Sequence, residues 1–318
     1  MKRALVTGAS GFVGANLALR LLADGHEVHL LLRPEFAPWR IKAFRDQVQL
    51  HRADLTDGAA VEALVAKIKP AWIFHLAAYG AYSQQADPGA IMRTNVQGTV
   101  NLLEACLKTG FEAFVNAGSS SEYGFKDHAP SEDDFLEPNS RYAVAKASAT
   151  LYCRHIAQHH DAPVTTLRLY SAYGPYEEPT RLLPTLIVRG LEGELPPLVN
   201  PDIARDFVHV ADVCEAFILA ARSGQKLGAV YNVGTGVQTS LRQVVEIAQR
   251  AMHLSAEPQW GSMADRMWDA TVWVANNRKI KEELGWKPTV NFEEGFNRML
   301  DWFRSDPAML SHYASVLK

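Results

Sequence analysis

The most constraining feature of the sequence is an apolar run, a glycine-rich turn and an amphipathic segment that follow one another at the N-terminus. Residues 4–6 read Ala-Leu-Val, as in a buried strand, and residues 8–14 read Gly-Ala-Ser-Gly-Phe-Val-Gly. Leu17, Leu21 and Leu22 then recur at helical spacing. Glycines at these places permit a tight turn, a close approach of the backbone to a pyrophosphate, and close packing of helix on strand. We therefore expect a dinucleotide-binding unit whose phosphates meet the free amides at the helix N-terminus.

Five further apolar runs alternate with helical segments along the first half of the chain. They lie at residues 28–32, 48–51, 72–78, 114–117 and 164–169. Such alternation predicts an α/β fold, a Rossmann-type doubly wound parallel sheet with ligands at the carboxyl ends of its strands. We expect residues 1–175 to form this domain, with returning segments at about 202–237. A smaller C-terminal α/β part, the substrate-binding cap, is expected at 176–201 and 238–318.

Composition narrows the class of protein. The 318 residues carry 32 Lys and Arg against 35 Asp and Glu, so the net charge of −3 gives no sign of a nucleic-acid partner. The three cysteines are odd in number and widely spaced, and they predict neither a disulfide framework nor a metal site. The apolar stretch at the N-terminus is too short for a signal peptide, and no run reaches the ~18 apolar residues of a membrane span. A cytoplasmic protein is expected.

The candidate catalytic residues lie near the middle of the chain. Tyr142 and Lys146 are four residues apart and therefore share one face of a helix. The ammonium group would stabilise the phenolate, so that the tyrosine becomes a usable acid or base near neutral pH. A serine cluster, Ser119, Ser120 and Ser121, follows the strand predicted at 114–117, and a hydroxyl there could hold the oxygen of a carbonyl or an alcohol. These residue types suit hydride transfer at an alcohol or ketone carbon.

Two charged residues near strand ends bear on the cofactor. Arg33 follows the second strand, where NAD-preferring enzymes carry an acid that binds the ribose 2′-hydroxyl. An arginine can pair a 2′-phosphate instead, which favours NADP(H) and leaves NAD(H) possible; the alternative is a surface loop charge. Asp54 follows the third strand, and it could face the adenine edge or cap the following helix.

Eight ordered motifs carry a family resemblance. They are Thr7–Gly14, His75–Ala78, Asn95, Gly118–Gly124, Tyr142–Lys146, Tyr173–Pro175, Arg205–Val210 and Tyr231–Gly234. With them, the chain resembles extended short-chain dehydrogenases/reductases of the nucleotide-sugar epimerase/dehydratase group over roughly residues 1 to 305. The resemblance implies an NAD(P) cofactor and a nucleotide-diphosphate sugar as the substrate.

The resemblance also implies roles for individual residues. Tyr142 would be the acid/base, Lys146 would hold the nicotinamide ribose, and Ser119 would bind the sugar oxygen. The cofactor residues would be Gly8, Ser10, Gly11, Phe12, Val13, Gly14, Arg33, Asp54, Leu55, Leu76, Ala77, Ala78, Asn95, Ala117, Tyr142, Lys146 and Tyr170. The substrate residues would be Tyr79, Ser119, Ser120, Ser121, Ser171, Arg205 and Arg266.

The two arginines would grip the diphosphate, because guanidinium forks suit phosphate oxygens. The alternatives are an ion pair of Arg205 with Asp206 or Asp212, and a solvated loop charge at Arg266. The family often carries asparagine where this chain has Ser171, a difference that could alter the grip on the sugar or the phosphate.

The serine cluster bears on which reaction of this group is expected. Its dehydratases place an aspartate–glutamate pair directly after the catalytic hydroxyl residue, at the positions of Ser120 and Ser121 here. Because serine cannot readily do the work of these carboxyls, a 4,6-dehydratase is not expected. Glu122 comes one position later, and on an extended segment it would point to the opposite side.

The leading interpretation is NADPH-dependent reduction of a 4-keto(-6-deoxy) nucleotide sugar. The alternative is a nucleotide-sugar 4-epimerase with tightly bound NAD. Less favoured are a nucleotide-uronate decarboxylase, which usually has glutamate at the position of Ser121, a small-ketone reductase, and a non-catalytic dinucleotide-binding protein. Helices are expected at 90–108 and 143–159; in this group they pair into a homodimer interface, although their apolar faces could equally cover the sheet.

Overall fold

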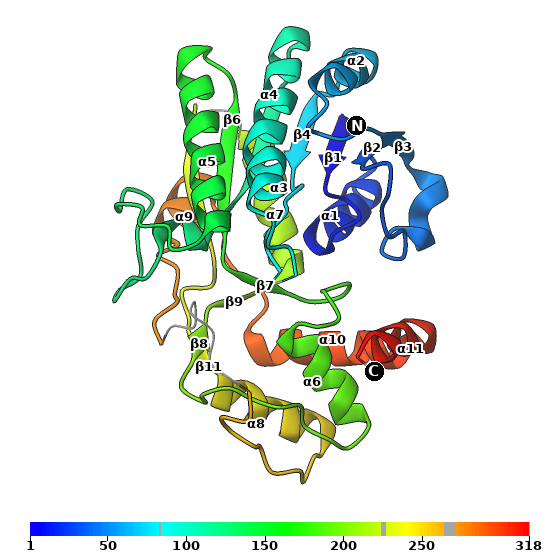
Figure 1. Ribbon diagram of the computed structural model, residues 1–318, viewed down its shortest axis with the longest axis vertical. Helices are drawn as coiled ribbons and strands as arrows, with labels where there is room; N and C mark the ends of the chain where they lie inside the picture. Colours follow the sequence, from blue (N-terminus) through cyan, green and yellow to red (C-terminus); the bar gives the residue numbers. More distant parts are fainter. Residues whose placement is uncertain (83, 224–226, 264–270, 318) are drawn as a thin grey trace.

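Seven parallel strands form the central sheet of the computed structural model, which describes residues 1–82, 84–223, 227–263 and 271–317 (Figure 1). The strands are β1 (Arg3–Thr7), β2 (Glu27–Leu32), β3 (Gln49–Arg52), β4 (Trp72–His75), β5 (Ala113–Ser119), β6 (Val164–Leu169) and β10 (Val230–Val233). Their order in the sheet is β10-β6-β5-β4-β1-β2-β3. The direction of winding reverses between β1 and β4, where α/β sheets bind their ligands.

Helices cover both faces of this sheet and enclose two apolar clusters. One face carries α1 (Phe12–Ala23), α7 (Val210–Ser223) and α9 (Arg278–Leu284), and the other carries α2 (Gly58–Ile68), α4 (Gly98–Thr109) and α5 (Arg141–His159). Shorter helical turns are η1 (Lys42–Gln47), α3 (Pro88–Met92), η2 (Arg93–Gln97) and η3 (Ser120–Tyr123). The predicted α/β doubly wound fold with a smaller C-terminal part is confirmed.

Several element bounds differ from those predicted. The fourth strand ends at His75 rather than at residue 78, because the next two amides, of Leu76 and Ala77, donate to Thr7 Oγ1 of the neighbouring strand (both 3.2 Å). The helix predicted at 90–108 is broken into α3, the π-helical turn η2 and α4. The strand β10 was not predicted as a strand from its sequence.

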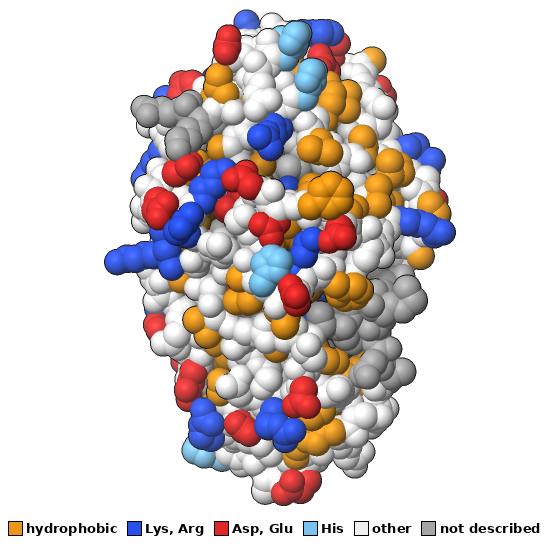
Figure 2. All heavy atoms as spheres, turned by 90° about the vertical axis from the view of Figure 1, so that its left-hand side faces the viewer, with side chains coloured by type: hydrophobic (Ala, Val, Ile, Leu, Met, Phe, Trp, Pro, Cys, Tyr) orange, Lys and Arg blue, Asp and Glu red, His pale blue; other side chains and the backbone are white. Residues whose placement is uncertain are grey.

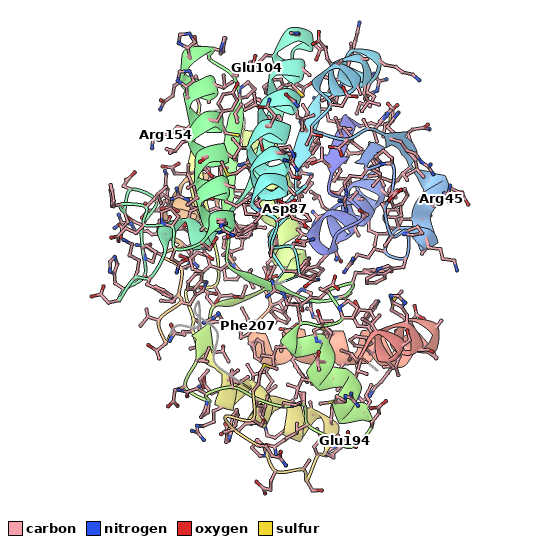
Figure 3. All side chains as sticks on the ribbon, viewed as in Figure 1. Arg45, Asp87, Glu104, Arg154, Glu194 and Phe207 are labelled. Atoms are coloured by element: carbon pink, nitrogen blue, oxygen red, sulfur yellow. The ribbon has the colours of Figure 1, made fainter. Side chains whose placement is uncertain are left out.

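In the described stretches of the C-terminal part there are four helices, which lie beneath the sheet in Figure 1. They are α6 (Leu182–Leu191), α8 (Leu241–Met252), α10 (Phe292–Ser305) and α11 (Pro307–Val316), and they share a third apolar cluster. Two short strand pairs join them to the sheet domain: β7 (Ser171–Tyr173) with β9 (Phe207–His209), and β8 (Ala204–Arg205) with β11 (Thr239–Ser240). In Figure 3, Phe207 lies at the level of this junction, whereas Glu104 lies at the far end of α4.

The C-terminal segment also returns to the sheet, since Ile280 of α9 and Trp286 belong to the apolar cluster that α1 and α7 form on one face of it. The division at residues 176–201 and 238–318 stays a prediction. Among the described residues, no helix is both long enough and apolar enough to cross a membrane.

Candidate active site

The glycine-rich turn meets the stereochemical conditions that its sequence predicts. Gly8 has a φ of +70°, and a Cβ there would lie 2.6 Å from the backbone nitrogen of Ala77. A Cβ on Gly14 would lie 2.3 Å from the carbonyl oxygen of Gly8. The N-cap residue Gly11 has no side chain, so the first amides of α1, at Phe12 and Val13, are left without a capping side chain. The turn therefore offers helix amides to a phosphate at the carboxyl end of β1.

A buried hydrogen-bond chain fixes the segment after β4 against this turn. His75 joins Thr7 Oγ1 through Nδ1 (2.8 Å) and Thr99 Oγ1 through Nε2 (2.9 Å). Thr99 donates to the carbonyl of Asn95, and the Asn95 side chain binds both the N–H and the carbonyl of Tyr79 (2.9 and 2.7 Å). Burial lowers the pKa of His75 to about 3, so the ring is neutral. The side chain of Asn95 thus positions the backbone of Tyr79.

The serine cluster turns sharply at the end of β5. Ser119 is the last residue of the strand, and Ser120 and Ser121 begin the 3-10 turn η3. Ser119 Oγ lies 2.8 Å from Ser121 Oγ and accepts a hydrogen bond from the Ser121 amide (3.2 Å). The segment is therefore a 3-10 turn and not the extended stretch that was predicted. Glu122 lies behind Ser119 in this turn. It is fully buried, and it accepts a hydrogen bond from the Ser119 amide (2.8 Å).

Tyr142 and Lys146 lie in the first two turns of α5, beside this cluster. Burial raises the pKa of Tyr142 to about 12, the negative charge of Glu122 acts in the same direction, and a side-chain hydrogen bond with Ser119 opposes them. Burial also lowers the pKa of Lys146, whereas the carboxylate of Glu122 acts to raise it. The high pKa of Tyr142 differs from the expectation that Lys146 brings it toward neutrality, because desolvation dominates. At neutral pH the Tyr142 hydroxyl is an acid held next to Ser119.

Comparisons with known proteins agree with this geometry. The family described as "GDP-mannose 4,6 dehydratase" matches residues 5–299. A UDP-glucose 4-epimerase of Mycolicibacterium smegmatis is 32% identical over 320 residues, which cover 95% of this chain and 99% of that protein. The chain belongs to the extended short-chain dehydrogenases/reductases, in the family of NAD-dependent nucleotide-sugar epimerases and dehydratases.

Two solved structures of this epimerase/dehydratase family are similar over nearly the whole chain. A UDP-glucose 4-epimerase from Thermotoga maritima with UDP-glucose has a TM-score of 0.86 at 27% identity, covering 95% of this chain and 98% of that one. A UDP-glucose 4-epimerase from Thermus thermophilus in complex with NAD has a TM-score of 0.82 at 31% identity, covering 95% and 99%. The protein is therefore an enzyme of this family.

The residues predicted near the adenosine lie at the ends of β2 and β3. Arg33 is exposed directly after β2, and its charge lowers the pKa of Asp54, although the backbone hydrogen bond from Thr56 is the larger cause. The carboxylate of Asp54 binds the N–H and hydroxyl of Thr56, whereas Asp57 caps α2. The helix-cap alternative for Asp54 is thus wrong. Leu55 is buried beside α4. The charge of Arg33 thus already acts on one acidic neighbour, Asp54.

Other predicted cofactor residues line the carboxyl ends of the inner strands. Ala117 is buried in β5, and Ala78 is exposed directly beyond Leu76 and Ala77. Tyr170 follows β6; its ring is buried and its hydroxyl has no hydrogen-bond partner among the described residues. Ser10 accepts a hydrogen bond on its carbonyl from Arg40 (3.3 Å). Direct contacts of these residues with a cofactor stay a prediction.

Of the predicted substrate residues, Arg205 is connected to the serine cluster through Trp273. Arg205 lies with its Cζ 5.5 Å from the ring of Trp273, whose indole N–H donates to Ser120 Oγ (3.2 Å). Ser171 begins β7, and its amide donates to the carbonyl of Asp206 (3.0 Å). Arg266 lies outside the described residues. Arg205 and Ser120 are thus joined through one tryptophan ring.

Sequence reasoning missed Tyr82 and Arg181, which act on the catalytic tyrosine, and Glu177, which interacts with Arg181. Both Tyr82 and Arg181 act electrostatically on Tyr142, and the guanidinium of Arg181 lies 5.3 Å from the ring of Tyr82. Glu177 is buried, and burial raises its pKa to about 8. The run Glu177-Glu178-Pro-Thr-Arg181 contains an unusual density of charge next to a family motif, and that was the available signal.

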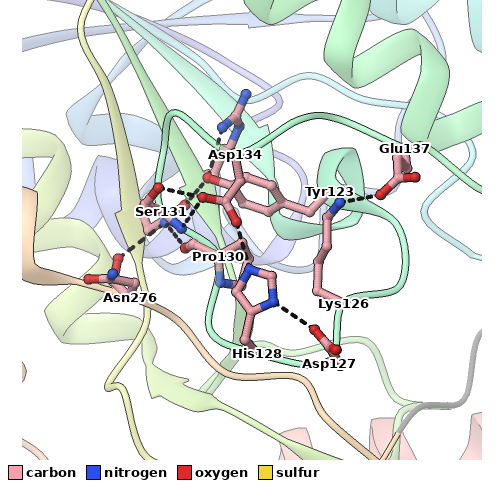
Figure 4. Close-up of polar contacts among 11 residues, drawn as sticks. Tyr123, Lys126, Asp127, His128, Pro130, Ser131, Asp134, Glu137 and Asn276 are labelled. Atoms are coloured by element: carbon pink, nitrogen blue, oxygen red, sulfur yellow. Dashed lines mark hydrogen bonds and ion pairs between the residues drawn. The ribbon is translucent and has the colours of Figure 1, made fainter.

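The loop between η3 and α5 closes one side of the site. Figure 4 shows His128 between Asp127 and Asp134, with 2.7 Å to each carboxylate, and Lys126 paired with Glu137. These contacts fold the loop back over the ring of Tyr123, which the buried Arg168 also contacts. Figure 2 shows the face formed by this loop and α5, where hydrophobic side chains lie among charged ones.

Proposed function

We propose that this enzyme is a nucleotide-sugar 4-epimerase. The observation that carries the proposal is the joint placement of Tyr142, Ser119 and Lys146 at the carboxyl end of β5, with hydroxyls and not carboxylates at Ser120 and Ser121. Such a site can move a hydride and a proton at one sugar carbon, but it has no carboxyl pair at these positions to expel a hydroxyl. The 4-epimerases among the similar proteins support this function over the 4-ketoreductase, which was the leading interpretation from the sequence.

In this proposal four side chains act on the substrate and the cofactor. Ser119 holds the oxygen on the sugar C4 by a hydrogen bond, and Tyr142 takes the hydroxyl proton while C4–H leaves as a hydride. Lys146 would hold the nicotinamide ribose and, together with the positive charge of the oxidised cofactor, would stabilise the Tyr142 phenolate; the cofactor would supply the hydride acceptor. After the 4-keto sugar has rotated within the site, the hydride would return to C4 on the opposite face and Tyr142 would return the proton to the oxygen. Arg205 would bind the diphosphate throughout, so that the nucleotide stays in place.

The test is turnover without added cofactor. Purified protein is incubated with UDP-glucose and a panel of other nucleotide hexoses, and the products are separated and identified. The C4 epimer of one substrate is expected to appear, together with protein-bound NAD released by acid. Absence of any C4 epimer across the panel would contradict the proposal.

A 4-ketoreductase is the second candidate, and two observations favour it. Tyr142 is protonated at neutral pH, which suits proton donation to an alkoxide, and Arg33 is exposed directly after β2, where its guanidinium could pair with a 2′-phosphate. This reading predicts consumption of NADPH with a 4-keto-6-deoxy nucleotide sugar. It also predicts that Arg33→Ala weakens NADPH binding more than NADH binding. Equal affinity for both cofactors in the unsubstituted protein would count against it.

A further inference from the structure

Glu122 lies at the centre of a buried polar group behind the catalytic serine. Its Oε1 accepts hydrogen bonds from the Ser119 amide (2.8 Å) and from the Thr150 hydroxyl (3.0 Å). Its Oε2 accepts a hydrogen bond from Arg168 Nε (2.9 Å). The side chain of Glu122 is 0% exposed and that of Arg168 is 4% exposed, so the pair is shielded from solvent. An ion pair held this far from water acts strongly on its neighbours.

Local structure is shaped around this carboxylate. The 3-10 turn η3 brings Glu122 back over the end of β5, and a Cβ on Gly118 would lie 2.8 Å from Glu122 Oε1. Only glycine therefore leaves room for the carboxylate at this point of the strand. Arg168 is fixed in turn, because Nη1 donates to the Tyr123 hydroxyl (2.8 Å) and to the carbonyl of Glu132 (3.3 Å).

The same carboxylate faces the catalytic helix. Tyr142, Lys146 and Thr150 recur every four residues along α5, and Thr150 binds Glu122 directly. Glu122 thus touches the strand that ends at Ser119 and the helix that carries the acid/base. It connects the two parts of the catalytic site through one side chain.

We propose that Glu122 is a positioning residue that fixes Ser119 against α5 and supplies the buried negative charge that Tyr142 and Lys146 face. The charged role is independent of any substrate, whereas the role in turnover rests on the proposed function. The carboxylate does not act as an acid or base on the sugar, because both of its oxygens are used by Ser119, Thr150 and Arg168.

Other groups also act on these side chains. Tyr142 faces Glu122, Tyr82, Arg181 and Ser119; Lys146 faces Glu122, Cys153 and His75; Glu122 faces Arg168 and Thr150. Glu122 disfavours the Tyr142 phenolate and favours the Lys146 ammonium. Removing its charge should therefore let Tyr142 ionise at lower pH.

The first experiment measures this charge without a substrate. In Glu122→Gln, tyrosinate absorbance is followed in the protein saturated with NAD, and the Tyr142→Phe background is subtracted from each titration. The ratio of ionised to neutral Tyr142 at a fixed alkaline pH should rise about tenfold, since removal of a buried charge nearby is worth about one pH unit. An unchanged ratio overturns the proposal, whether or not 4-epimerase activity is found.

Asp212→Asn is the matched control. Asp212 is also buried, and its carboxylate accepts hydrogen bonds from Thr289 and Val290. Both substitutions should lower the melting temperature, because each removes the charge of a satisfied buried carboxylate. Only Glu122→Gln should shift the ionisation of Tyr142. An equal shift of Tyr142 ionisation in Asp212→Asn would mean that a general loss of stability, and not the charge of Glu122, is responsible.

The second experiment separates position from charge. Glu122→Ala removes the acceptor for the Ser119 amide, and kcat should fall about tenfold or more while the Kd for NAD stays within about twofold. Glu122→Gln keeps the acceptor and should restore most of the lost kcat. If Glu122→Ala does not fold, the ionisation shift in Glu122→Gln remains the deciding result. A Glu122→Ala protein that folds and retains full kcat would overturn the positioning role.

Discussion

The indole N–H of Trp273 donates a hydrogen bond to Ser120 Oγ across 153 residues of sequence. One residue belongs to the segment before α9 and the other to the turn that follows the catalytic serine. The ring of Trp273 also lies beside Arg205, with 5.5 Å from the guanidinium carbon to its centre. The hydrogen bond thus joins the C-terminal part of the chain to the serine cluster near its middle.

Trp273→Phe keeps a ring beside Arg205 but removes the hydrogen bond to Ser120. Because one such bond contributes about 0.5–1.5 kcal/mol, KM for the nucleotide sugar should rise about two- to tenfold. The Kd for NAD should not change, since Trp273 contacts Ser120 and Arg205, which are predicted to bind the substrate. Steady-state kinetics and cofactor titration check both statements. A loss of cofactor affinity alone would contradict this placement of Trp273.

Tyr142→Phe should abolish most turnover while the protein still binds its cofactor. Removal of a general acid/base costs about a hundred- to ten-thousand-fold in rate. Tyr152→Phe is the matched control, because Tyr152 lies on the same helix but its hydroxyl donates to Glu104. It should retain turnover. Near-normal activity of Tyr142→Phe would show that another group moves the proton.

His75 makes stability depend on pH. The unfolded chain binds a proton at this residue below its ordinary pKa of about 6.5, whereas the folded protein does so only near pH 3, because burial lowers the pKa. Between these limits, the contribution of His75 therefore lowers the free energy of unfolding by about 1.4 kcal/mol for each pH unit that the pH falls. Urea unfolding at several pH values measures this slope.

Many carboxylates titrate in the same pH range, so the contribution of His75 is obtained as the difference in slope between the unsubstituted protein and His75→Gln. His75→Gln should be less stable at pH 7, because the bonds to Thr7 and Thr99 are altered. Its stability should fall less steeply below pH 6.5 than that of the unsubstituted protein. Identical slopes for the two proteins would mean that His75 is protonated in the folded state.

The homodimer stays a prediction, and exposed apolar residues on α5 give it a test. Leu151 is 57% exposed and Val144 is 42% exposed. If this face pairs with a second copy, Leu151→Glu should shift the protein toward monomer in light scattering, because a charge would be buried without a partner. Val237→Glu, at another exposed apolar site (65%), should leave the assembly unchanged. An unsubstituted protein that is already monomeric would rule out the pairing.

Local patterns were enough to predict most of the sheet and the catalytic helix. Short-range geometry can be predicted from neighbouring residues alone. The glycines at positions 8, 11 and 14 predict the turn before α1, and the spacing of Tyr142 and Lys146 predicts a shared helix face. The burial of Glu122 could not be predicted, because its partner Arg168 lies 46 residues away and the turn η3 replaces an extended segment. The end of β4 likewise depends on hydrogen bonds to Thr7, and the high pKa of Tyr142 depends on burial by segments distant in sequence.

The most direct test of the central claim follows the hydrogen on the sugar C4. Nucleotide hexoses carrying deuterium at C4, UDP-glucose among them, are incubated with the purified protein without added cofactor, and the products are examined by NMR. A C4 epimer that retains deuterium at C4 is expected, because the hydride leaves and returns at one carbon. Deuterium found at C6 of a 4-keto-6-deoxy product would contradict it, since that outcome requires the elimination for which Ser120 and Ser121 offer no carboxyl group.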